Sequence, residues 1–175
     1  MGREEDDFHL SMALGDVDTQ RWGIVSKVER EEMGLYLAKM QRVTNAYEPA
    51  IKAGYAYYEL LNGRNNSVFA GMMSNLKFDF PRLLEVLNSI DSMSARWGKR
   101  DWFKKLNMRI RYGVKGDLIY LVAIPNIGKV RAEKLWDANI RTVADVVNNP
   151  IKVQKVLNLK EERIKQICED AKTLQ

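Results

Sequence analysis

The chain has 175 residues, of which 46% are hydrophobic and 29% charged, and this composition is typical of a folded soluble protein rather than a disordered tail. No apolar run approaches the roughly 18 to 20 residues that span a bilayer, and the acidic first residues lack the apolar segment of a signal peptide. The single cysteine, Cys168, excludes an intramolecular disulfide and favours a reducing, cytoplasmic compartment.

The net charge of +5 is unevenly distributed along the chain. Residues 96–131 carry ten Lys and Arg against two Asp, so this segment has a charge of +8 and the remainder a charge of −3. A solvated helix face usually mixes the two signs. The basic segment therefore favours a polyanionic partner, because each Lys or Arg placed on a phosphate releases condensed counterions.

The N-terminal part predicts one ambiguous segment followed by helices. Residues 8–14 are expected to form a strand or an arm packed on the body, ended by Gly15. Ser26 and the Glu three residues later have the spacing of a capping box, so a helix is expected to begin there. Pro49 suits a first helical turn and predicts a helix over residues 50–61.

Two more helices are predicted in the middle of the chain. A short one covers residues 68–76, and the next begins at Asp79, as N-cap, with Pro81 in its first turn. Apolar residues recur along this second helix at helical spacing and are expected to share one side, formed by Leu83, Leu84, Leu87 and Ile90.

The expected fold class is all-α, because the sequence contains almost no alternating, period-two pattern of apolar residues. Gly113 and Gly116 mark a junction between two units. We expect a helical bundle over residues 1–113 and a compact helix-hairpin-helix domain over residues 114–175.

A helix-hairpin-helix pattern lies at the start of the second unit. Asp117 is expected to cap a short helix over residues 118–123, and a second helix begins at Lys129. The connection matches the recurring pattern of an apolar residue, Pro-Gly-Ile-Gly, three residues and an Ala, except that Asn126 replaces the first Gly. Asn tolerates a left-handed backbone better than most residues. The expected core positions are Leu121, Ile124, Ile127, Ala132 and Leu135.

This hairpin predicts a phosphate-binding site without base preference. The tight turn leaves backbone N–H groups unpaired at the positive N-terminal end of the second helix, where a phosphate oxygen can accept from them. Phosphate contacts position a nucleic acid but carry no sequence information. The DNA-binding residues expected here are Pro125, Asn126, Ile127, Gly128, Lys129, Val130 and Arg131.

A second, weaker hairpin is predicted around residues 156–159, followed by Ile164 and Ile167. Its expected role is to pack against the first hairpin. The alternative interpretation of the first hairpin is likewise a compact module that only packs protein.

The residues from 109 onwards form a specific series: residues 109–115, Leu118, Pro125, Gly128, Arg131-Ala132, Leu135-Trp136 and Ile140-Arg141. This series closely resembles the C-terminal end of archaeal DNA repair helicases of the Ski-two-like class of superfamily two, relatives of metazoan helicase Q. Upstream, residues 8–10, 35–37 and 79–90 resemble the family more loosely but in the same order. The resemblance covers nearly the whole chain but only the back third of such a helicase.

In that family, a helical bundle carries a long ratchet helix that touches the translocating single strand, and a helix-hairpin-helix domain holds the 3′ tail and restrains the motor. The resemblance implies that the ratchet helix begins at Asp79 and that Arg82 contacts the strand. The family's stacking Trp, two turns further on, falls on Ser89. Base stacking would therefore have to come from Trp97 or Trp102, for which core packing is the alternative role.

The basic run after the hairpin differs from that of the family. The family usually has Arg-x-Arg-Ala-Arg, whereas Lys129 and Arg131 are followed here by Glu133. Because a carboxylate repels phosphate, tail binding weaker than in typical members is expected. Arg109 and Arg111, from the basic segment, complete the set of expected DNA contacts.

The resemblance implies a non-motor C-terminal segment of an ATP-dependent DNA helicase, acting as ratchet and brake on single-stranded or forked DNA during unwinding in repair or replication restart. Its implied partners are that DNA and the motor domains of the same helicase. The chain has no phosphate-binding glycine loop, and His9 is its only histidine. We therefore expect no ATPase, other catalytic or metal site in this chain, with ATP and Mg belonging to the parent motor.

Two other classes of function stay open on the sequence. One is a stand-alone DNA-binding adaptor whose N-terminal bundle docks a protein through its acidic start and through Met72 and Met73. The other is a structural or nuclease-associated hairpin module.

Overall fold

The computed structural model describes residues 2–17, 24–43, 48–94 and 97–174, and within these ranges it contains helices and turns but no strand. The expected all-α fold is confirmed. No helix in these ranges has both the length and the apolar character that crossing a bilayer requires. The helices are α1 (Gly2–Val17), α2 (Lys27–Glu32), α3 (Gly34–Val43), α4 (Glu48–Leu61), α5 (Ala70–Ser94), α6 (Arg100–Tyr112), η2 (Gly116–Leu118), α7 (Ile119–Val122), α8 (Lys129–Asp137), α9 (Val143–Asn148), α10 (Pro150–Leu157) and α11 (Glu161–Lys172).

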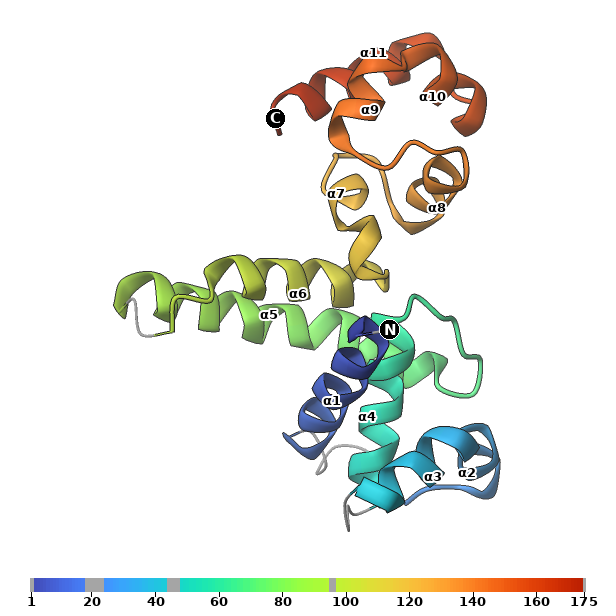
Figure 1. Ribbon diagram of the computed structural model, residues 1–175, viewed down its shortest axis with the longest axis vertical. Coiled ribbons are helices and arrows are strands. Elements are labelled where there is room, and N and C mark those ends of the chain that lie inside the picture. Colours follow the sequence, from blue (N-terminus) through green and yellow to red (C-terminus); the bar gives the residue numbers. More distant parts are fainter. Residues whose placement is uncertain (1, 18–23, 44–47, 95–96, 175) are drawn as a thin grey trace.

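The helices fall into three regions along the molecule (Figure 1). Helices α1 to α4 form one end, α5 and α6 lie side by side as an arm that projects sideways, and α7 to α11 form the other end. The chain enters the last region through the end of α6, where Gly113 takes the left-handed conformation with φ of 60°.

Residues 8–14 form part of helix α1, so the strand alternative is wrong, whereas the alternative of a segment packed on the body agrees with the contact between α1 and α4. Helix α1 packs along α4, and Gly15 lies inside α1 rather than ending it. A Cβ at Gly15 would lie 2.4 Å from both the Ala50 carbonyl oxygen and the Gly54 nitrogen. The backbones of α1 and α4 can approach each other this closely only because position 15 is a glycine. Packing between the two helices therefore decides the local structure of this segment.

The Gly15→Ala variant should therefore be strongly destabilised. Its methyl group meets backbone atoms of α4 that cannot move without separating the helices, and we expect a loss of about 1–3 kcal/mol in the free energy of unfolding. Gly71→Ala is the matched control, because a Cβ at Gly71 meets nothing within 4 Å. It should gain about 0.5–1 kcal/mol from helix propensity. Urea denaturation measures both, and equal stability of the two variants would contradict the close α1–α4 contact.

Two predictions of helix starts in this region are confirmed. The Ser26 hydroxyl accepts from the Glu29 amide while the Glu29 carboxylate accepts from the Ser26 amide, at 3.3 and 2.9 Å. Pro49 lies in the first turn of α4, and Gly63 follows its end with φ of 67°.

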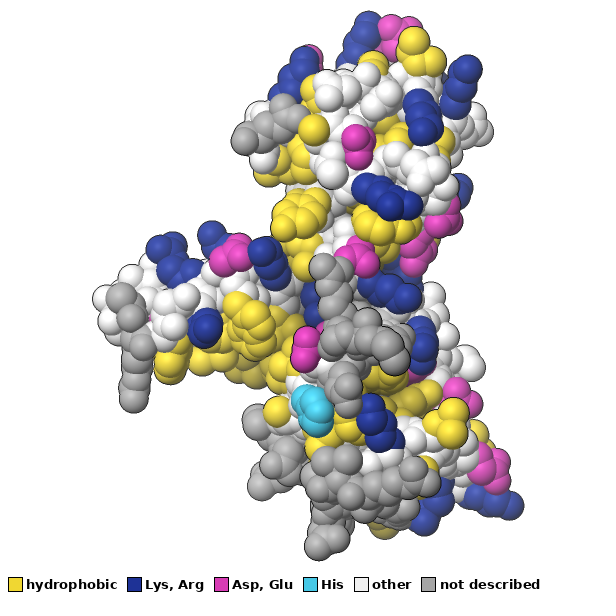
Figure 2. Space-filling view, viewed as in Figure 1, with side chains coloured by type: hydrophobic (Ala, Val, Ile, Leu, Met, Phe, Trp, Pro, Cys, Tyr) yellow, Lys and Arg dark blue, Asp and Glu magenta, His cyan; other side chains and the backbone are white. Residues whose placement is uncertain are grey.

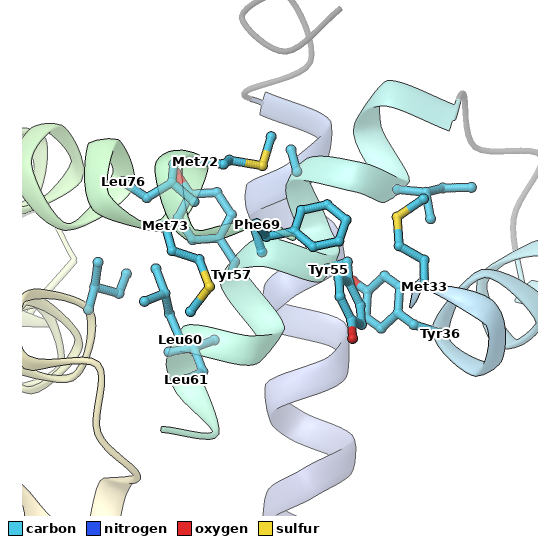
Figure 3. Close-up of a cluster of buried hydrophobic side chains, with 14 of the residues drawn as sticks. Met33, Tyr36, Tyr55, Tyr57, Leu60, Leu61, Phe69, Met72, Met73 and Leu76 are labelled. Atoms are coloured by element: carbon cyan, nitrogen blue, oxygen red, sulfur yellow. The ribbon is translucent and has the colours of Figure 1, made fainter. Parts of the chain in front are cut away.

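An aromatic core joins α1, α3, α4 and the segment before α5 (Figure 3). The ring centroids of Tyr55 and Phe69 lie 5.1 Å apart, edge to face, and the Tyr36 hydroxyl is 2.8 Å from the hydroxyl of Ser11. Met72 and Met73 belong to the same core, with only 8% and 4% of their surface exposed. The expectation that these two methionines form a docking surface is therefore wrong.

Helix α5 corrects a second expectation, because it runs unbroken through the segment that was predicted to start a new helix at Asp79. Pro81 lies in its interior, where it removes one helical hydrogen bond. Packing against α6 compensates for this loss, since Pro81 is buried and its carbonyl accepts from Asn107 of α6 at 3.1 Å. The predicted apolar side is also partly wrong: Leu84 is buried, but Leu83 is 57% exposed.

The turn between α5 and α6 is held by Asp91, which is 1% exposed. Its carboxylate accepts from the amides of Trp97, Gly98 and Lys99 at 2.7, 3.0 and 2.7 Å. Burial alone would raise the pKa of Asp91, but the three N–H donors outweigh burial and lower it. One carboxylate thus fixes the tip of the arm.

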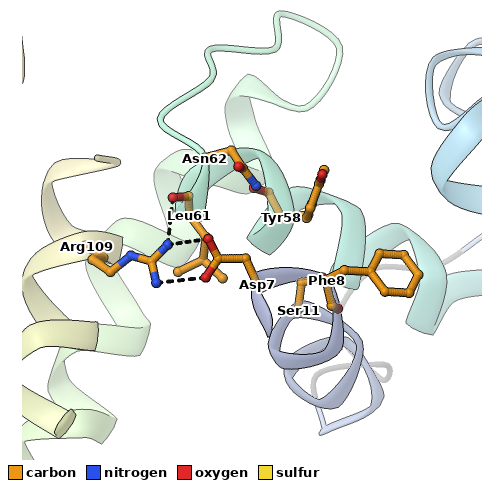
Figure 4. Close-up of polar contacts among 7 residues, drawn as sticks. All are labelled: Asp7, Phe8, Ser11, Tyr58, Leu61, Asn62 and Arg109. Atoms are coloured by element: carbon orange, nitrogen blue, oxygen red, sulfur yellow. Dashed lines mark hydrogen bonds and ion pairs between the residues drawn. The ribbon is translucent and has the colours of Figure 1, made fainter. Parts of the chain in front are cut away.

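An ion pair fixes the base of the arm (Figure 4). The Arg109 guanidinium of α6 donates to both carboxylate oxygens of Asp7 in α1, at 2.9 and 2.7 Å, and to the Leu61 carbonyl at the end of α4, at 2.9 Å. Both charged side chains are 15% exposed. Three helices from distant parts of the sequence therefore meet at one guanidinium.

The C-terminal helices share a hydrophobic core of their own, which begins at Val114, whereas the N-terminal core ends at Ile110. The predicted hairpin core positions are confirmed, since Leu121, Ile124, Ile127, Ala132 and Leu135 are all at most 2% exposed. Asp117 lies inside the 3-10 turn η2 instead of capping a helix at 118. The division into folding units at residue 113 stays a prediction.

Candidate nucleic-acid interface

The hairpin turn between α7 and α8 has the expected local geometry. Asn126 adopts φ of 67°, in the left-handed region, and the Ile127 amide donates back to the Ile124 carbonyl at 3.0 Å. Gly128 is the extended N-cap of α8. No side chain in the described part of the chain caps the first amides of α8, and its first turn holds no acidic residue. These amides are available to an anion.

A second hairpin between α10 and α11 has the same spacing. Asn158 has φ of 50°, and α11 begins three residues later, as α8 does after Asn126. Ile164 and Ile167 are buried at the positions that correspond to Ala132 and Leu135. The two turns are therefore geometric counterparts within one core.

The charges at the two helix starts differ. Helix α11 carries Glu161 and Glu162 in its first turn, and carboxylates there complement the positive end of the helix. At the start of α8 the side chains are Lys129, Val130 and Arg131. Neither helix start has a side-chain cap, but in the described part of the chain only the α8 start combines uncapped amides and basic side chains with a first turn free of carboxylates.

Lys129 connects the hairpin to the N-terminal body. Its ammonium donates to the Gly63 carbonyl and the Asn65 side-chain oxygen in the loop between α4 and α5, at 2.9 and 3.2 Å. Lys77 of α5 lies nearby, and its pKa is lowered by burial and by the charge of Lys129. Two ammonium groups that repel each other favour a bound anion between them.

Lys77 was not predicted as a site residue, because the sequence places it between two predicted helices. The continuous α5 instead carries it to the junction, where its side chain lies against Gly113. No motif contains Lys77, so a contact between distant segments was needed to find it.

The remaining predicted hairpin residues are arranged around the turn. The Arg131 guanidinium donates to the Asn126 carbonyl and remains partly exposed. Pro125 and Asn126 are exposed, and Val130 is 64% exposed. The Ile127 side chain is buried in the core, so only its backbone faces the turn.

Two of the three upstream arginines, Arg109 and Arg82, interact with residues outside the hairpin. Arg109 is engaged in the ion pair with Asp7 described above, which makes it a packing residue. Arg111 is exposed near the end of α6. Arg82 lies on α5 with its guanidinium 4.2 Å from the centre of the Phe78 ring, and the Ser89 hydroxyl bonds back to the Glu85 carbonyl.

The left-handed turn makes a prediction for substitutions of Asn126. Replacing it with Ala puts a Cβ without a compensating polar group in the left-handed region, so we expect a loss of about 1 kcal/mol in unfolding free energy. Asn126→Gly should retain more stability than Asn126→Ala, because Gly has no Cβ penalty there. Asn75→Ala, on the exposed side of α5, is the control that should cost nothing. Chemical denaturation in which Asn126→Ala matched Asn75→Ala would argue against the left-handed turn.

Comparison with known proteins gives partial matches to one kind of enzyme. No family model matches the chain. It is 36% identical over 86 residues to an ATP-dependent DNA helicase Hel308 of Methanocaldococcus jannaschii, a match that covers 49% of this chain and 7% of the relative. The Hel308 helicase of Thermoplasma acidophilum is 34% identical over 70 residues, which are 39% of this chain and 10% of that protein. That of Aeropyrum pernix is 47% identical over 38 residues, 22% of this chain and 5% of the relative.

These matches confirm the predicted resemblance to archaeal DNA helicases over parts of the chain, up to 49% of it, and its extension over nearly the whole chain stays a prediction. The chain spans a tenth or less of the length of the curated relatives it matches.

Proposed function

We propose that the chain is a non-motor segment of an ATP-dependent DNA helicase and that it binds single-stranded or forked DNA through backbone phosphates at the first hairpin. The observation that carries the proposal is the charge difference between two hairpins of the same geometry. The α8 start has open amides with Lys129, Arg131 and, from α5, Lys77 beside it and no carboxylate in its first turn, whereas the first turn of α11 carries Glu161 and Glu162.

Phosphate would satisfy three features of this site together. Its oxygens would accept from the open amides of α8 and lie at the positive end of the helix dipole. Its charge would relieve the repulsion between Lys77 and Lys129. None of these contacts reads a base, so binding would be independent of sequence.

Arg131 is the most direct side-chain partner. It already lies beside the turn through its bond to the Asn126 carbonyl, so a phosphate at the turn needs no large rearrangement. Lys129 is different, because its ammonium is held by Gly63 and Asn65. Lys129 would contribute to phosphate binding chiefly through its charge and by holding the hairpin in position.

An exposed apolar surface on the arm formed by α5 and α6 supports the proposal that the chain packs against other parts of a helicase. The outer side of α5 has a row of exposed apolar side chains, visible along the lower edge of the arm in Figure 2. Their exposed fractions are 62% for Phe78, 57% for Leu83, 57% for Val86, 38% for Ile90 and 83% for Met93. We propose that the motor domains and the translocating strand cover this row, which would make α5 the ratchet helix and the hairpin region the brake.

The adaptor hypothesis would use the same row of α5 as its protein-docking surface, since Met72 and Met73 are buried. In the helicase case ATP and Mg would act in motor domains outside this chain. We expect the chain itself to bind DNA without hydrolysing ATP.

Salt dependence of DNA binding tests the phosphate contacts. Arg131→Ala should weaken binding to a single-stranded oligonucleotide equally for all base sequences. It should also lower the slope of log affinity against log salt by about 0.7, the value for one phosphate contact on a single strand. Fluorescence anisotropy at several salt concentrations measures both quantities.

Arg163→Ala is the matched control, because Arg163 occupies the corresponding position after Asn158, behind the acidic start of α11. It should leave both affinity and slope near the values of the parent chain. Equal effects of the two substitutions, or binding of the parent chain that does not depend on salt, would contradict the proposal.

A further inference from the structure

A cleft of about 680 Å³ lies where the arm meets the C-terminal helices. One wall is a single face of α6, with Trp102, Lys105, Leu106 and Arg109 at helical spacing. The opposite wall comes from η2, α7, the end of α8 and the segment that follows it, and residues of α1 and Asn62 complete the lining. Its size lies within the range of small-ligand sites, and none of the hairpin residues discussed above lines it.

Aromatic rings line both walls of this cleft. They are Trp102 of α6, Tyr120 of α7 and Trp136 of α8. Trp102 is 46% exposed and Tyr120 56% exposed, so large parts of both rings face solvent. Trp102 is supported from one side by Phe103, with ring centroids 5.3 Å apart. Supported but open rings are the surfaces on which nucleobases stack.

Basic side chains flank the rings. Lys105 lies close enough to Tyr120 for the two to interact electrostatically across the cleft, and it is paired with Asp101 at 2.6 Å. The Arg141 guanidinium lies 5.0 Å from the centre of the Trp136 ring. Lys115 is exposed at the edge of the cleft. Figure 2 shows basic side chains along the upper edge of the arm as far as this junction.

Carboxylates also line the cleft and constrain what fits. Asp7 is neutralised by Arg109, but Asp6 and Asp117 lie in the lining as well. Carboxylates repel phosphate, yet they accept hydrogen bonds from the amino groups of bases. A ligand with planar, hydrogen-bonding rings on one side and phosphates on the other therefore matches the cleft better than an inorganic anion does.

We propose that this cleft binds bases of single-stranded DNA, with Trp102 and Tyr120 as stacking surfaces and with Lys115 and Arg141 on the flanking phosphates. The proposal rests on the proposed function, because it needs DNA at the neighbouring hairpin. The cleft and hairpin are neighbours: Asn62 lines the cleft, and the next residue, Gly63, holds Lys129 through its carbonyl. One strand can therefore contact both sites.

Strands with and without bases separate the cleft from the hairpin. The probe is a mixed-sequence single-stranded oligonucleotide, compared with the same strand in which abasic sugars replace the nucleosides. Phosphate contacts alone bind the two equally. The full chain should prefer the strand with bases, and Trp102→Ala should weaken binding to that strand roughly 5- to 150-fold, the range for loss of one base stack. Binding of Trp102→Ala to the abasic strand should not change.

Trp97→Ala is the matched control, since Trp97 is 44% exposed on the same arm but does not line the cleft. Trp97→Ala should keep the preference for the strand with bases, and Trp102→Phe should keep part of that preference. Tyr120→Ala should reduce the preference independently of Trp102. Equal binding of the parent chain to both strands would overturn the cleft proposal and leave the hairpin proposal standing. Retention of the full preference by Trp102→Ala would likewise overturn the cleft proposal and leave the hairpin proposal standing. Absence of binding to either strand at low salt would overturn both.

Discussion

The left-handed backbone at Asn126 determines which surface the C-terminal helices present. With φ of 67° the chain reverses within a few residues, and the first amides of α8 are left at the surface. Ile124 and Ile127, on either side of Asn126, are buried and anchor the turn. The same geometry recurs at Asn158, so the shape of the turn does not distinguish the two hairpins. The side chains of the following helix do, because a positive helix end attracts an anion only where no carboxylate already occupies it.

The surroundings of the first hairpin depend on contacts between distant parts of the chain. Lys129 is bonded to the loop after α4, and Arg109 joins α6 to α1 and α4. These contacts bring Lys77 of α5 next to the hairpin and form the cleft beside it. The proposed DNA surface is thus composite. The hairpin supplies backbone amides, whereas the arm supplies the charge of Lys77 and the aromatic ring of Trp102.

Local signals predicted the C-terminal part well. The core of the first hairpin and the second hairpin with Ile164 and Ile167 follow from short-range spacing and turn residues. The same reasoning was wrong at Pro81, where a start signal was overridden by packing against α6. It left residues 8–14 open between a strand and a packed arm, and they form a helix whose backbone approaches α4 closely at Gly15. The role of Arg109 could not be predicted either, because its partner Asp7 lies 102 residues away.

We propose that phosphate binds at the amides of one hairpin and not at those of its counterpart. Titrating the isotope-labelled chain with a single-stranded oligonucleotide and following its backbone amide resonances by NMR tests this most directly. The largest chemical-shift changes should occur at residues 127–131, with little change at residues 159–163. Changes of equal size at both turns, or larger changes at the second, would contradict it.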